Sequence, residues 1–206
     1  MLSEIQVFLR LGFEHIADPR GYDHILFVIA LCAGYEFRHW RRLLILVTAF
    51  TIGHSITLAL ATLRIVTIDD ALVEFLIPVT ILLTGIVNIV ASSPGSGGPP
   101  EGGGARFLKY LMALGFGLVH GLGFSNFLRS LLGAEEGIAL PLLSFNVGLE
   151  IGQICIVVAV LSVTSILVGL AKMRRHDWIL VLSGATSGVA IILLVEQFLA
   201  WYSNVS

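Results

Sequence analysis

The sequence predicts an all-α fold, a polytopic bundle of membrane-spanning helices, and its composition and apolar runs are the observations that predict it. Hydrophobic residues make up 56% of the 206 residues and charged residues only 13%, whereas a soluble domain carries ~25% charged residues. Most of the chain falls into apolar runs near the ~20 residues that a helix needs to cross a bilayer. A disordered chain is excluded and a soluble domain is disfavoured. The net charge of −2 provides no basic surface for nucleic acid.

Six apolar runs are predicted to span the membrane, at about residues 23–37, 42–63, 70–91, 107–128, 138–170 and 178–202. Residues 1–16 alternate apolar and polar groups and lack the basic stretch of a signal peptide, which predicts a short N-terminal interfacial helix. Residues 92–105 read SSPGSGGPPEGGGA, the composition of a flexible Gly/Pro/Ser linker. We expect residues 1–206 to form a single transmembrane domain, with this linker between its two halves.

The positions of lysine and arginine predict the orientation of the bundle. Of the twelve basic residues, eight fall on one side of the predicted spans. Because cytoplasmic loops carry the excess of positive charge, this side is predicted to face the cytoplasm and both termini to lie outside. The eight are Arg38, Arg41, Arg42, Arg106, Lys109, Lys172, Arg174 and Arg175.

Small residues four positions apart recur in three of the predicted spans. Such spacing lets two helix backbones approach closely inside a membrane. The sequence therefore predicts tight helix contacts at Gly117 with Gly121, Gly148 with Gly152, and Gly184 with Gly188.

Several ionisable residues fall at membrane depth, where they are costly and usually functional. His54 and His120 follow the basic residues Arg42 and Lys109 by twelve and eleven positions. At ~1.5 Å per residue both then lie roughly 16–18 Å above the inner edge, near the midplane. The orientation rests on lysine and arginine alone, and it also places the remaining candidates in the outer half of the membrane. These are His15, Asp18, Asp23 and His24 around the start of the first span, and Asn146, Glu150 and Gln153 on one face of the fifth.

Imidazole and carboxylate side chains together indicate a site for a divalent transition metal, because neutral histidine binds nickel, cobalt, zinc and copper well. Each residue also has a simpler structural interpretation. A single histidine in a membrane helix often hydrogen-bonds a neighbouring helix, and Glu150 can be a protonated structural acid or part of a proton relay. The metal-site candidates are His15, Asp23, His24, His54, His120 and Glu150, with Asp18, Asn146 and Gln153 as secondary candidates.

Four segments in order resemble one known family. They are the run from Gly12-Phe13-Glu14-His15-Ile16 to Gly21-Tyr22-Asp23-His24, LVTAFTIGHSITLAL at 46–60, GFGLVHGLGF at 115–124, and LLSFNVGLEIGQ at 142–153. The combination resembles the HupE/UreJ family of bacterial membrane proteins. The resemblance covers most of residues 12–155.

This resemblance implies a six- to seven-span permease or accessory protein of the bacterial inner membrane, associated with nickel or cobalt uptake. It also implies hydrogenase or urease maturation proteins as partners, beside the lipid bilayer and the metal ion. The histidine motif of the family maps onto His15, Asp23 and His24. One departure is that residues 16–18 separate His15 from Pro19, where the hydrogenase-accessory form has His and Pro adjacent.

Three functions remain open from the sequence. The first is a transition-metal permease that captures its ion outside and passes it through His54, His120 and Glu150. The second is an intramembrane zinc-dependent hydrolase acting on a lipid or membrane peptide, with Glu150 as candidate general base. The third is a non-catalytic metal-sensing or scaffold protein. The inner half of the predicted spans offers few ligands, which disfavours a transport path. Because these three functions all remain open, the sequence leaves undecided whether the protein is an enzyme.

Overall fold

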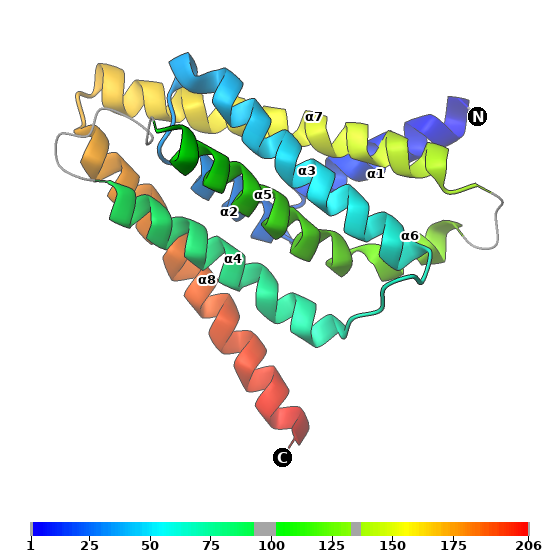
Figure 1. Cartoon of the computed structure of the whole chain (residues 1–206). Helices are drawn as coiled ribbons and strands as arrows, with labels where there is room; N and C mark the ends of the chain where they lie inside the picture. Colours follow the sequence, from blue (N-terminus) through cyan, green and yellow to red (C-terminus); the bar gives the residue numbers. More distant parts are fainter. Residues whose placement is uncertain (1, 93–101, 133–136, 206) are drawn as a thin grey trace.

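The structure, a computed structural model, describes residues 2–92, 102–132 and 137–205, and the regular secondary structure in them is entirely helical (Figure 1). Four helical segments are long and apolar enough to cross a membrane: Phe37–Thr62, Asp70–Ala91, Ala139–Leu170 and Arg175–Ser203. A fifth candidate is a pair of helices bent by 50°. The all-α membrane bundle is therefore confirmed, whereas the predicted count of six spans is not. The helices are α1 (Leu2–Ala17), α2 (Asp23–Cys32), η1 (Phe37–His39), α3 (Trp40–Thr62), α4 (Asp70–Ala91), α5 (Gly103–Gly123), α6 (Ser125–Leu132), α7 (Ala139–Thr164), η2 (Ser165–Leu170) and α8 (Arg175–Val205).

The predicted boundaries hold best where the sequence carries a clear stop or start signal. Helix α4 begins at Asp70 as predicted, because the side chain of Asp69 accepts a hydrogen bond from the backbone N–H of Leu72 and caps the helix. The predicted span 107–128 is instead broken at Phe124 into α5 and α6. Most of the predicted linker lies outside the described residues, and its last three residues, 103–105, already belong to α5.

The first predicted span, 23–37, corresponds only to the ten-residue helix α2, which is too short to cross a bilayer by itself. Helix α1 does not lie apart from the bundle, as expected of an interfacial helix. It packs parallel to α7 so closely that a methyl group on Gly148 would overlap the carbonyl oxygen of Leu9. Helix α2 then continues along the second half of α7, where Val28 and Cys32 share a core cluster with Val157. Together α1 and α2 form one interrupted helical path along α7.

Helices α3 and α5 also run parallel, in contact through small residues. A methyl group on Gly53 would overlap the carbonyl oxygen of Leu114, and one on Gly117 would overlap that of Phe50. The tight contacts predicted at Gly117 with Gly121 and at Gly148 with Gly152 are therefore present.

The contact predicted at Gly184 with Gly188 is wrong, because no described atom of another helix lies within 4 Å of a methyl group at either position. Helix α8 instead turns Ser183 and Ser187, one position earlier on the helix, towards Gly85 of α4.

All eight basic residues named above lie at or near one end of the bundle, which we call the basic end. There α2, η2 and α4 end and α3, α5 and α8 begin (Figure 1). An ion pair of 3.0 Å between Arg175 and Glu36 joins α8 to the loop before α3. The opposite end, which we call the terminal end, holds the start of α1 and the end of α8. That the basic end faces the cytoplasm stays a prediction.

Candidate metal centre

Five of the six metal-site candidates meet where the path of α1 and α2 is interrupted. We call them the histidine cluster: His15 from α1, Asp23 and His24 from α2, His54 from α3, and His120 from α5. The nitrogens of His15, His24 and His54 can all lie within 4.8 Å of one another, and so can the ligand atoms of Asp23, His24 and His120. His24 belongs to both groups and joins them into one site.

The imidazole rings of the cluster are in direct contact. The ring centroids of His15 and His24 are 4.6 Å apart and those of His24 and His120 are 4.9 Å apart, both pairs edge to face. The ring of His54 lies 5.8 Å from that of His15 and 5.9 Å from that of His24. His54 and His120 are fully buried and His24 is 5% exposed. Four imidazoles from four helices thus share a small volume inside the bundle.

Five nitrogens of the cluster are buried and have no hydrogen-bond partner among the described residues. Leaving a buried polar atom unpaired costs about 1–3 kcal/mol, so a cluster of them indicates a ligand that satisfies them. A divalent ion accepts one lone pair from each of several neutral imidazoles, so an ion at this position satisfies at most one nitrogen of each of the four rings. The five are Nε2 of His15, Nε2 of His24, both ring nitrogens of His54, and Nδ1 of His120.

Hydrogen bonds to two of these rings select the tautomer that leaves a lone pair for a metal. The hydroxyl of Thr80 donates to the carbonyl oxygen of Ile77, so it accepts from His120 Nε2, 2.9 Å away. Nδ1 of His120 then carries the lone pair. A carboxylate of Asp23 accepts from His24 Nδ1 at 3.3 Å, which leaves the lone pair on Nε2. Such partners commonly orient histidine ligands of metals.

Replacing Thr80 with valine should weaken metal binding about 10–100-fold, because His120 loses the acceptor that fixes its tautomer and orientation. Nickel affinity of the purified protein, measured by calorimetry, checks this. Thr186→Val is the matched control: Thr186 is also buried, but its hydroxyl bonds only to carbonyl groups of its own helix. Equal affinities for both variants and the unsubstituted protein would contradict the role of Thr80.

Phenylalanine rings enclose the cluster and exclude other hydrogen-bond partners. Phe124 lies 4.0 Å from the ring of His15, Phe50 and Phe27 each lie 5.1 Å from that of His120, and Phe145 stacks on His54 at 6.3 Å. The low polarity of this shell strengthens the interaction of a metal ion with its ligands.

Two cavities reach the cluster from the half of the bundle nearest the terminal end. One, of about 590 Å³, is lined by Glu14, His15, Asp18, Phe124 and Phe127 among others. The other, of about 370 Å³, includes Asp23, Glu74 and Gln197 in its lining. Each therefore presents carboxylates on the way to a cluster residue, which favours the approach of a cation.

The remaining candidates lie elsewhere. Glu150 is in neither metal-ligand group, and its carboxylate accepts a 2.6 Å hydrogen bond from the exposed Thr48 of α3. One turn further along α7, the amide oxygen of Gln153 accepts from Thr51 at 2.8 Å. The face of α7 that carries Glu150 and Gln153 thus borders α3. The amide oxygen of Asn146, one turn before Glu150, is buried and has no hydrogen-bond partner among the described residues. Asp18 accepts from the backbone N–H of Arg20 and lines the larger cavity.

Sequence reasoning missed Thr80 and the phenylalanine shell. The phenylalanines had a local signal, because Phe27 and Phe50 lie three and four residues from a cluster histidine on the same helix, and Phe124 directly follows the helix of His120. Thr80 had none, since it lies 40 residues from His120 and meets it only through the packing of α4 on α5.

The fold and the cluster define a multi-pass helical membrane protein with a candidate metal centre. A family model described as HupE / UreJ protein matches residues 1–202, so the chain belongs to the HupE/UreJ family. Membership supports, in general terms, a nickel- or cobalt-related accessory or permease role. Searches of curated proteins and of solved structures gave no match.

Proposed function

We propose that this protein is a membrane permease for a divalent transition-metal ion of the nickel or cobalt class, and that the histidine cluster binds the ion during its passage. One observation carries this proposal. Five buried imidazole nitrogens without described partners converge at a break in a helical path inside the bundle. Transporters commonly build their substrate sites at such broken helices near the bilayer midplane.

The surroundings of the cluster support a transported ion over a permanently held one. Half-buried His15 and Asp23 each line one of the two cavities, so the cluster is reached from two sides. Neutral imidazoles with a single carboxylate suit nickel and cobalt better than magnesium or calcium. The accessory role, in which the protein would hand metal to hydrogenase or urease maturation proteins, uses the same site.

Uptake by liposomes that contain the full-length protein tests the proposal. With a metal-sensitive dye inside, external Ni²⁺ or Co²⁺ should enter with saturable kinetics. The double variant His54→Ala/His120→Ala should slow entry by about tenfold or more, because it removes two of the four imidazoles. His176→Ala is the control, since His176 lies at the basic end, where it bonds to Ser92. A protein that binds metal but admits no Ni²⁺, Co²⁺, Zn²⁺ or Cu²⁺ would overturn the permease proposal.

A zinc-dependent hydrolase is the second candidate, and the 590 Å³ cavity is the observation that favours it. That cavity joins His15 to the apolar side chains of Leu11, Phe13 and Phe127, a lining suited to a lipid chain. His15, His24 and His54 match the three protein ligands of a catalytic zinc, with a water in the fourth position. One tightly held zinc per chain, together with cleavage of a fluorogenic lipid ester and no ion uptake, would favour this function.

A further inference from the structure

Two rows of polar side chains lead from the histidine cluster towards the basic end. The first is formed on α3 by Thr51 and Thr48, which lie between His54 and the start of that helix and are hydrogen-bonded to Gln153 and Glu150 of α7. It reaches the outside of the bundle, because Thr48 is exposed beside Ile45, which is 52% exposed. The second row occupies one face of α4 at every fourth residue: Thr80, Thr84 and Asn88.

The row on α4 stays inside the bundle. Thr80 and Thr84 are only 4% and 7% exposed. The row starts at Thr80, which is bonded to His120, and runs about 12 Å along the helix to Asn88 at ~1.5 Å per residue. Helix α5 provides the facing wall, on which Phe116, Met112 and Lys109 follow His120 at helical spacing towards the basic end.

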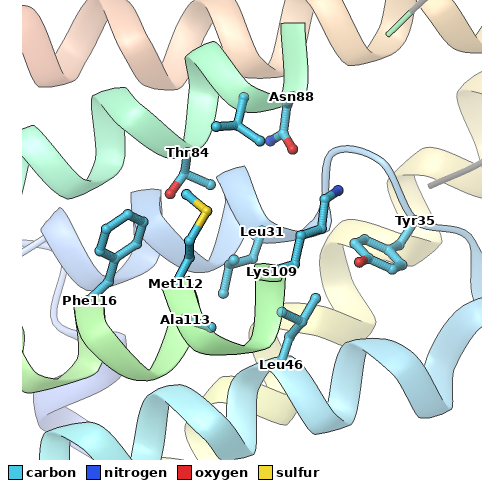
Figure 2. Close-up of a pocket in the computed structure, with 10 residues that line it drawn as sticks. Leu31, Tyr35, Leu46, Thr84, Asn88, Lys109, Met112, Ala113 and Phe116 are labelled. Carbon is cyan, nitrogen blue, oxygen red and sulfur yellow. The ribbon is translucent and has the colours of Figure 1, made fainter. Parts of the chain in front are cut away.

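This row leads into a cavity of about 30 Å³ between α2, α3, α4 and α5, enough for a water molecule or a largely dehydrated ion. Figure 2 shows Thr84 and Asn88 reaching in from α4, and Lys109 extending from α5 towards the loop that carries Tyr35. The cavity therefore lies between the histidine cluster and the basic end.

The oxygens in this cavity are oriented to accept. The hydroxyl of Thr84 donates to the carbonyl oxygen of Thr80, so its lone pairs remain for a cation. The amide nitrogen of Asn88 donates to the carbonyl oxygen of Ala30 at 2.7 Å, which leaves Oδ1 as the acceptor. Ala30 belongs to the last turn of α2, and the C-terminal end of a helix attracts cations. Such neutral oxygens bind nickel and cobalt more weakly than imidazoles do. Weaker binding is what a site on the way to release requires, because the ion must be able to leave it.

Lys109 places a positive charge in the same cavity. Its ammonium group lies 5.7 Å from the ring centroid of Tyr35, a cation–π contact. A phenol is neutral near pH 7 in any case, and burial raises the pKa of Tyr35 further, to about 12. The ammonium group of Lys109 thus occupies a position beside the end of α2 that favours a cation. Its charge repels any metal ion that enters the same cavity.

We propose that Thr84, Asn88 and the C-terminal end of α2 form a second, weaker divalent-cation site between the histidine cluster and the basic end, and that Lys109 closes it at rest. This inference rests on the proposed permease function and adds the inner half of its path. An ion that leaves His120 passes Thr80 and Thr84, and Lys109 moves aside to let it through.

Uptake rates in liposomes test the second site. Lys109→Met should speed Ni²⁺ entry about threefold or more, because the repelling charge is gone. Lys172→Met is the matched control, since Lys172 is an exposed lysine at the same end, outside the cavity. Thr84→Val/Asn88→Leu should slow entry about threefold or more while the nickel affinity of the cluster stays within about twofold. The inference is overturned if Ni²⁺ enters no faster through Lys109→Met than through the unsubstituted protein. It is also overturned if Glu150→Gln, in the first row, slows entry and Thr84→Val/Asn88→Leu does not.

A second measurement does not depend on transport. In a Cys155→Ser background, Asn88→Cys should react with a small water-soluble thiol reagent about fivefold faster when Lys109→Met is also present, because the cavity is then open to water. The Cys155→Ser protein without Asn88→Cys measures the reaction of the remaining cysteine, Cys32, which is then subtracted. If Lys109→Met leaves the reactivity of the cysteine unchanged, the second site is refuted, even if the protein transports nothing. If the reactivity rises and the protein binds metal but takes up none, only the permease proposal is refuted.

Discussion

Replacing His24 with alanine is expected to abolish specific metal binding. His24 supplies the one imidazole shared by both metal-ligand groups, and its ring contacts those of His15, His54 and His120. Its loss also removes the partner that orients the Asp23 carboxylate. Because orienting partners alone change metal affinity about 10–100-fold, the loss of a shared ligand should weaken nickel binding by about 100-fold or more.

Nickel titration of the purified protein, followed by calorimetry, measures this effect. His120→Ala should cost less, about tenfold, because the group of His15, His24 and His54 remains. His176→Ala, at the basic end, should leave the affinity unchanged. A His24→Ala protein that elutes as the unsubstituted protein does and binds nickel equally well would rule out the histidine cluster as the metal centre.

The sequence was sufficient to predict the helical membrane class and to place His54 and His120 level with each other, whereas their depth in a membrane stays a prediction. Composition decides the class because a bilayer accepts few charges. The matching level follows from counting residues from Arg42 and Lys109, since both helices are regular and begin at the basic end. That α3 and α5 run parallel, as this count requires, explains why the two histidines reach the same cluster.

The interruption between α1 and α2 could not be predicted in the same way. Helix α1 presents Phe8 and Ile16 to the core formed with α7, while Arg10 and Glu14 form an exposed ion pair. Such a two-sided pattern is also typical of a helix lying on a membrane surface. The close approaches between α1 and α7, such as that of Gly148 to Leu9, distinguish the two arrangements, and they join residues far apart in the chain.

Glu150 shows the limit of reasoning from one helix. Its spacing with Gln153 correctly predicts a shared face, and that face contacts α3 through Thr48 and Thr51. The spacing contains no information on how α7 is rotated relative to the histidines of other helices. The carboxylate therefore lies beside α3, outside both groups of ligand atoms.

Replacing Gly148 with alanine should have the second large effect, although the atoms nearest to its added methyl group belong to Leu9 and Phe13, which are outside the cluster. The added methyl group would overlap the carbonyl oxygen of Leu9, a backbone atom that can yield only if α1 moves away from α7. Helix α1 carries His15, so the displacement pulls one imidazole out of the cluster. Overpacking of this kind typically costs about 1–3 kcal/mol of stability, and a misplaced ligand should weaken nickel binding by about tenfold.

Thermal unfolding and nickel titration of the same preparations separate the two consequences. Gly12→Ala should behave like Gly148→Ala, because its methyl group would overlap the carbonyl oxygen of Phe145 across the same interface. Gly184→Ala is the control: no described atom of another helix lies within 4 Å of its methyl group, and alanine is the better helix former. If Gly148→Ala bound nickel as tightly as Gly184→Ala, His15 would not depend on the packing of α1 against α7. The interrupted path would then be incidental to the metal centre, because the cluster would form without the helix contact that positions its first histidine.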